Sequence, residues 1–186
     1  QKPLSAIPVP EKYYKGGERR SPRPYQKEAM QIMDKALEGG KRKMLLVMAT
    51  GTGKTDTIAL YLKRLFEAGL ANRALFLVDR IDLGVQTKEV FDEILTDYPS
   101  KLLYGGKQRD ESSIIISTLP TLYSQLSLFT SGYFDVIISD EAHRSIFGIY
   151  NGVLSHFEAI RIGMTATPSG YVDRNTYKLF GCWDET

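Results

Sequence analysis

The residues best suited to chemistry in this sequence lie in a glycine-rich loop that ends in lysine and threonine. The loop reads Met48-Ala49-Thr50-Gly51-Thr52-Gly53-Lys54-Thr55. Glycine tolerates backbone angles that turn successive N–H groups toward one point, and such a turn before a helix cradles phosphate groups. A lysine beside the cradle binds the terminal phosphates of a nucleotide, and a threonine hydroxyl ligates Mg²⁺. We therefore predict that ATP and Mg²⁺ are bound by Thr50, Gly51, Thr52, Gly53, Lys54 and Thr55.

The context of this loop supports that prediction. The apolar run Met44–Met48 precedes it and is typical of a strand buried on both faces. A helical pattern with Ile58, Leu62, Leu65 and Phe66 on one side follows it. The strict phosphate-loop pattern has glycine at position 48, where this chain has methionine.

A second group of reactive side chains begins at Asp140. The tetrad Asp140-Glu141-Ala142-His143 directly follows a predicted strand over 134–139. Two adjacent carboxylates at a strand end are costly to bury unless they meet a cation or a water molecule that needs activation. We expect Asp140 to hold Mg²⁺ and Glu141 to orient and deprotonate the attacking water. Loops after parallel strands lie along one edge of a sheet, so these acids should face the phosphate loop.

The elements that must position these groups alternate between strands and helices. Helices are predicted from Pro24 to the Gly39-Gly40 pair, after Thr55, and over 82–95. The predicted strands cover 44–48, 74–78, 113–117, 134–139 and 160–164, with a weaker one at 101–104. This alternation predicts an α/β domain with a mainly parallel sheet covered by helices on both faces.

The residue patterns at the two ends of the chain predict segments outside the central domain. Residues 1–22 are rich in basic residues and proline, and predict an extended segment that either touches nucleic acid or is a solvated linker. Residues 23–170 form the predicted nucleotide-binding domain. The last stretch, 171–186, lacks a stop signal and is expected to begin the connection to a further domain.

Composition excludes several classes of protein. The chain has 186 residues, which suits one domain. Its single cysteine, Cys182, excludes an internal disulfide and a cysteine-rich zinc site. No apolar run is long enough to span a bilayer and no signal peptide is evident, so we expect a cytoplasmic setting without a membrane partner.

The phosphate loop together with Asp-Glu-Ala-His resembles the DEAH-type superfamily 2 helicases and translocases, in which the first motor domain is RecA-like. The likeness extends over residues 22–168. It implies that Gln26 of the segment Arg23-Pro24-Tyr25-Gln26 hydrogen-bonds adenine, with Arg23 or Tyr25 packing nearby. Thr165 and Thr167 would couple the nucleotide state to movement on DNA, and His143 would bridge the two motifs.

The same resemblance implies contacts with the nucleic-acid backbone. Arg80 lies in the segment that matches the strand-contacting motif after the second strand. Gly105 and Thr118 match the next two backbone-contacting elements.

A denser likeness, running from Asp140 to Phe180, is to the motor (R) subunit of type I restriction enzymes. It includes His143-Arg144-Ser145-Ile146 and Thr176-Tyr177-Lys178-Leu179-Phe180, which lie outside the nucleotide chemistry. It implies double-stranded DNA, a second RecA-like domain of the same polypeptide, and methylase and specificity subunits as partners. The acidic pair and lysine of the family's nuclease have no matching block, so this chain should not cut DNA. We also expect it to hydrolyse ATP very slowly by itself.

Two alternatives remain open at this point. The first is the motor domain of a type III restriction enzyme or of a DNA-repair helicase. The second, of another class, is a non-hydrolysing nucleotide-binding switch module in a DNA-bound assembly.

Overall fold

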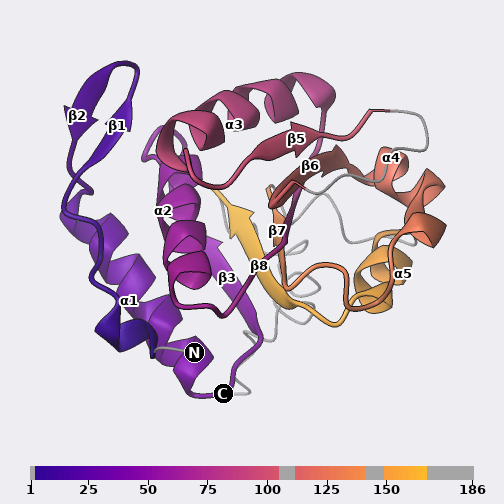
Figure 1. The fold of residues 1–186 in the computed structure, drawn as a ribbon, viewed down its shortest axis with the longest axis horizontal. Helices are drawn as coiled ribbons and strands as arrows, with labels where there is room; N and C mark the ends of the chain where they lie inside the picture. Colours follow the sequence, from indigo (N-terminus) through magenta and orange to yellow (C-terminus); the bar gives the residue numbers. More distant parts are fainter. Residues whose placement is uncertain (1–2, 105–111, 141–148, 167–186) are drawn as a thin grey trace.

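A computed structural model describes residues 3–104, 112–140 and 149–166 of the chain. Its central feature is a six-stranded parallel sheet with the order β3-β8-β7-β4-β6-β5 (Figure 1). The strands are β3 (Lys43–Val47), β4 (Ala74–Val78), β5 (Ser100–Leu102), β6 (Ile114–Thr118), β7 (Val136–Ser139) and β8 (Ile160–Thr165). The predicted parallel sheet is confirmed, including the weak strand at its edge.

Helices cover both faces of the sheet, as predicted. They are α1 (Pro24–Glu38), α2 (Lys54–Glu67), α3 (Ile81–Ile94), α4 (Leu119–Ser124) and α5 (Ile149–His156), with 3-10 turns at Leu4–Ala6 and Leu126–Leu128. Alternate residues of each central strand enter two separate apolar clusters. In β4, Phe76 packs into the cluster shared with α1, α2 and α3, and Leu75 packs into the cluster shared with α4 and α5. Every residue of β4 is buried because both faces are covered.

Strand β3 differs from the sequence-based expectation. We predicted burial on both faces, but Leu45 is half-buried and Val47 is 44% exposed. The physical reason is the strand order: β3 lies at the edge of the sheet and pairs with β8 alone among the described strands. The apolar run therefore predicted the strand correctly, but the prediction that both of its faces are buried was wrong.

The N-terminal segment is also more structured than predicted. A hairpin of β1 (Tyr13–Lys15) and β2 (Glu18–Arg20) follows the first 3-10 turn and stands beside α2 and α3 (Figure 1). Leu4 and Ile7 are buried in the core. The carbonyl oxygens of these two residues accept hydrogen bonds of 3.1 and 2.5 Å from the guanidinium of Arg64 on α2. The segment is therefore part of the domain and not a solvated linker.

In the part of the chain that the structure describes, no helix combines the length and the apolar character that a membrane span requires.

Candidate nucleotide site

The phosphate loop joins the end of β3 to the start of α2. Gly51 and Gly53 both adopt left-handed backbone angles, with φ of 75° and 83°. The Thr52 hydroxyl donates a 2.6 Å hydrogen bond to the Ala49 carbonyl, which closes the turn. Helix α2 begins directly after Gly53, so its unpaired N–H groups and the positive end of its dipole face the loop. This is the local arrangement that binds anions.

The loop opens onto a cavity of about 440 Å³. Its walls come from the loop, the start of α2, one side of α3, the hairpin and the end of β7. The lining residues are Lys15, Thr50, Gly51, Gly53, Lys54, Thr55, Asp56, Leu83, Gln86, Thr87, Val90 and Asp140. The predicted loop and the first predicted carboxylate thus line the same space.

The strand order explains this convergence. Strand β8 lies between β3 and β7, and all three are parallel. The loop after β3 and Asp140 after β7 therefore emerge at the same edge of the sheet. Thr165, at the end of β8 between them, is buried, and its carbonyl accepts a 3.0 Å hydrogen bond from the Met48 N–H. The coupling role of Thr165 stays a prediction. Glu141, His143 and Thr167 lie outside the described residues.

Hydrogen bonds of the Gln26 side chain connect the start of α1 to the phosphate loop. Its side-chain amide donates to the Gly53 carbonyl at 3.2 Å and to the Thr57 hydroxyl at 3.0 Å, and its carbonyl oxygen accepts from the Arg23 N–H at 2.9 Å. The Arg23 guanidinium donates to the Tyr25 hydroxyl at 2.7 Å. Neither Gln26 nor Arg23 lines the cavity described above. The structure therefore gives Gln26 a role in holding the loop, and its contact with adenine stays a prediction.

The residues predicted to contact nucleic acid lie at the ends of neighbouring strands. Arg80 follows β4, is exposed, and has its guanidinium 3.6 Å from the Asp82 carboxylate. Thr118 ends β6, which pairs with β4, but it is buried and shares a 2.9 Å hydrogen bond with the Thr121 hydroxyl. Arg80 is thus the more accessible of the two. Gly105 lies outside the described residues.

Four polar residues of the cavity are not predicted from the sequence to line a nucleotide site: Lys15, Asp56, Gln86 and Thr87. Asp56 follows Thr55 directly, so its place in the first helical turn was a local signal that could have been used. Lys15 and the two α3 residues reach the cavity only through tertiary packing. No spacing in the sequence indicates this.

The side chains present suit a magnesium–nucleotide polyphosphate. Lys54 is half-buried on the cavity wall and has no hydrogen-bond or ion-pair partner within the described residues. The Thr55 hydroxyl and the Asp140 carboxylate, which both line the cavity, are oxygen groups of the kind that Mg²⁺ prefers. A Cβ atom on Gly53 would lie 2.8 Å from the Gln26 amide nitrogen, so the loop has no room for a side chain there.

Gly53→Ala should therefore destabilise the domain. Alanine in the left-handed region costs about 1 to 2 kcal/mol, and the collision with the anchored Gln26 adds to that. Gly69→Ala is the matched control, because Gly69 has φ of 69° and, apart from its chain neighbours, no atom of the described residues lies within 4 Å of its Cβ position. Urea unfolding without nucleotide should show a larger decrease in the free energy of unfolding for Gly53→Ala than for Gly69→Ala. Equal losses would mean that Gln26 moves aside freely.

Comparison with known proteins identifies the family of the chain. The model of the family described as "Type III restriction enzyme, res subunit" matches residues 19–170. The endonuclease subunit of the type I restriction enzyme EcoKI of Escherichia coli K12 is 32% identical over 188 residues, which covers 84% of this chain and 16% of that subunit. The chain thus spans less than a fifth of that relative's length.

Solved structures share the fold. A fragment of a protein assigned as the HsdR subunit of a type I restriction enzyme from Vibrio vulnificus YJ016 has 28% identity and a TM-score of 0.69, covering 92% of this chain and 30% of that one. The SWI2/SNF2 ATPase core of Sulfolobus solfataricus, solved with double-stranded DNA, has 18% identity and a TM-score of 0.75, covering 87% and 36%. The predicted RecA-like fold is confirmed.

Proposed function

The chain belongs to the family of the res subunit of type III restriction enzymes, and from this membership we propose that it is the ATP-binding first motor domain of a DNA translocase. The R subunit of a type I restriction enzyme is the favoured parent, because the type I subunit named above aligns over 84% of the chain. The parent would move along double-stranded DNA before cleavage. Its methylase and specificity subunits would hold the recognised site.

One observation carries the proposal. The phosphate loop and Asp140 come from strands that are separated by β8, yet both line one cavity of about 440 Å³. Lys54 would bind the β- and γ-phosphates, and Thr55 and Asp140 would hold Mg²⁺. The metal, when bound, neutralises negative charge on the phosphates. Glu141, next to Asp140, would orient the attacking water and accept its proton.

The residues that complete the motor would come from a second RecA-like domain. ATP binding would close the two domains on each other, and hydrolysis would reopen them. Arg80 and Thr118, at the ends of β4 and β6, would contact the DNA backbone on the same side of the sheet. Binding through the backbone should depend strongly on salt and little on base sequence.

The test is ATP turnover by the full-length protein, measured with and without duplex DNA. We expect stimulation by DNA in the full-length protein. Residues 1–186 alone should turn over ATP at least about 10³-fold more slowly, because an arginine supplied by a second domain contributes about 10³- to 10⁵-fold where it is used. Rapid DNA-stimulated turnover by residues 1–186 would contradict the proposal that a second domain completes the site. Nucleotide binding without turnover in the full-length protein would favour a switch module.

A further inference from the structure

The cavity contains a second lysine that comes from the N-terminal hairpin. Lys15, at the end of β1, lines the same cavity as Lys54 and Thr55. Its ammonium lies 2.5 Å from a carboxylate oxygen of Asp56, in the first turn of α2. The Lys15 side chain is 28% exposed and that of Asp56 is 7% exposed. The lysine therefore borders the space where we place the phosphates.

Asp56 is in contact distance of the phosphate loop itself. The other oxygen of its carboxylate lies 3.7 Å from the position that a Cβ atom on Gly53 would take. A carboxylate this close to a phosphate site would repel a polyanion if its charge were not balanced. Lys15 supplies that balance from outside the loop.

The hairpin is fixed against the cavity by two further contacts. The Tyr13 hydroxyl donates a 3.1 Å hydrogen bond to Asp56, and the Gly16 N–H donates a 3.0 Å hydrogen bond to Glu93 on α3. Burial, and then the Asp56 carboxylate, raise the pKa of Tyr13 to about 12, so this hydroxyl remains a donor at neutral pH. Lys15 is thus held in place from both α2 and α3, and Figure 1 shows the hairpin beside these helices.

An ammonium group has three N–H donors, and the contact with Asp56 uses one of them. The others remain able to bond phosphate oxygens, and an anchored ammonium loses less entropy on binding than a free side chain. We propose that Lys15 is a second phosphate-binding cation of the nucleotide cavity, held there by Asp56. This inference rests on the proposed ATP-binding function.

The experiment measures the dissociation constants of ATP–Mg²⁺ and of adenosine for the full-length protein by calorimetry. Lys15→Met should weaken ATP–Mg²⁺ binding about tenfold, the effect of losing one charged hydrogen bond, and should leave adenosine binding unchanged. The salt dependence of ATP–Mg²⁺ binding should also fall. Lys15→Arg should stay within about threefold of the wild type, because the cation is kept. Lys12→Met, at an exposed lysine close to the hairpin, is the matched control and should bind normally.

A double variant separates direct contact from simple charge balance. If Lys15 binds phosphate, Lys15→Met with Asp56→Asn recovers at most part of the affinity, because only the repulsion by Asp56 is relieved. If Lys15 only neutralises Asp56, removing both charges restores wild-type affinity, and the inference is wrong. Wild-type affinity of Lys15→Met overturns it too. Thermal unfolding of each variant checks that the hairpin change has not unfolded the domain.

Lys54→Ala distinguishes this inference from the proposed function. Loss of binding in Lys54→Ala with none in Lys15→Met overturns the role of Lys15 and leaves the ATP site standing. Unchanged ATP–Mg²⁺ binding in Lys54→Ala would contradict the proposed ATP site itself.

Discussion

Lys54→Ala is expected to abolish measurable ATP turnover by the full-length protein and to weaken ATP–Mg²⁺ binding by at least about a hundredfold. Lys54 follows Gly53 at the start of α2 and lines the cavity beside Thr55. Removing one preorganised donor to developing charge in an enzyme site typically costs about 10²- to 10³-fold in rate. Loss of the ground-state contact with the phosphates adds to that effect.

The fold should survive this substitution. Lys54 has no hydrogen-bond or ion-pair partner within the described residues, so alanine leaves no buried group unpaired there. Unfolding by urea should therefore change little, by about 0.5 kcal/mol or less. Lys41→Ala, at an exposed lysine before β3, is the control for a general loss of positive charge. Normal turnover in Lys54→Ala would refute the assignment of this loop to ATP.

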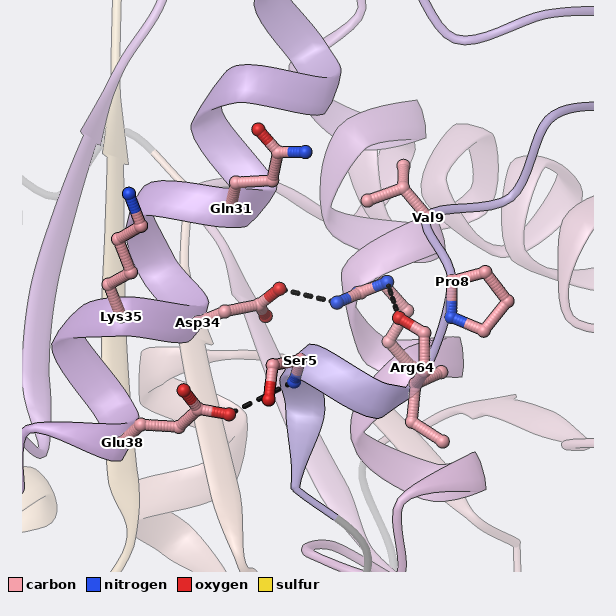
Figure 2. A pocket seen from close by; sticks show the side chains of 9 residues that line it. Ser5, Pro8, Val9, Gln31, Asp34, Lys35, Glu38 and Arg64 are labelled. Atoms are coloured by element: carbon pink, nitrogen blue, oxygen red, sulfur yellow. Dashed lines mark hydrogen bonds and ion pairs between the residues drawn. The ribbon is translucent and has the colours of Figure 1, made fainter.

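Arg64→Ala should have the largest effect on stability, although Arg64 lies away from the nucleotide cavity. Figure 2 shows its guanidinium between the Asp34 carboxylate on α1 and the N-terminal segment. Arg64 and Asp34 are both buried, and the same guanidinium donates to the carbonyls of Leu4 and Ile7. Breaking a buried ion pair by removing one partner costs about 3 to 5 kcal/mol, because the other charge remains buried and unpaired.

Urea unfolding measures this loss, with Lys63→Ala as the control on the same helix. Lys63 is half-buried and makes no ion pair among the described residues, so its replacement should change stability by about 0.5 kcal/mol or less. Adding Asp34→Leu to Arg64→Ala should recover only part of the loss, since the Leu4 and Ile7 carbonyls still lack their donor. Full recovery of the lost stability would show that the hydrogen bonds to the Leu4 and Ile7 carbonyls contribute nothing to it.

The deficit of Arg64→Ala should depend on pH. Burial raises the pKa of Asp34 above its usual value, and Arg64 opposes this rise. Removing Arg64 raises this pKa further, so Asp34 takes up a proton in the folded variant more readily. A carboxyl group with a raised pKa in the folded state favours folding below its unfolded pKa, and this contribution is lost as the pH rises through the folded pKa. The deficit should therefore be smaller at about pH 5 than at about pH 8.

The cavity beside Arg64 is separate from the nucleotide site. It measures about 480 Å³ and is lined by the N-terminal segment, α1 and α2 (Figure 2). The Ser5 N–H donates a 3.0 Å hydrogen bond to Glu38 across it. Among the described residues, Oδ1 of Asp34 and Nε of Arg64 are buried and have no hydrogen-bond partner. Buried polar atoms of this kind are the ones that ordered water binds in proteins.

The sequence by itself determined the class of the fold and predicted the chemistry of the loop. A glycine-rich turn between an apolar strand and an amphipathic helix is encoded within a few consecutive residues, so Gly51 to Thr55 could be identified without a structure. The alternation of strands and helices predicted the parallel sheet for the same reason. Because loops after parallel strands lie at one edge of the sheet, Asp140 was predicted to lie near the phosphate loop. Asp140 and the loop residues do line the same cavity.

Only the tertiary structure decided how residues distant in the sequence complete the site. The strand order placed β3 at an edge, which left Val47 partly exposed although its apolar neighbours suggested full burial. The N-terminal hairpin brought Lys15 across 41 positions to Asp56, and α3 added Gln86 and Thr87 to the cavity. These outcomes depend on long-range packing between whole elements. Local residue patterns give neither the order of the strands in the sheet nor the helices against which the hairpin packs.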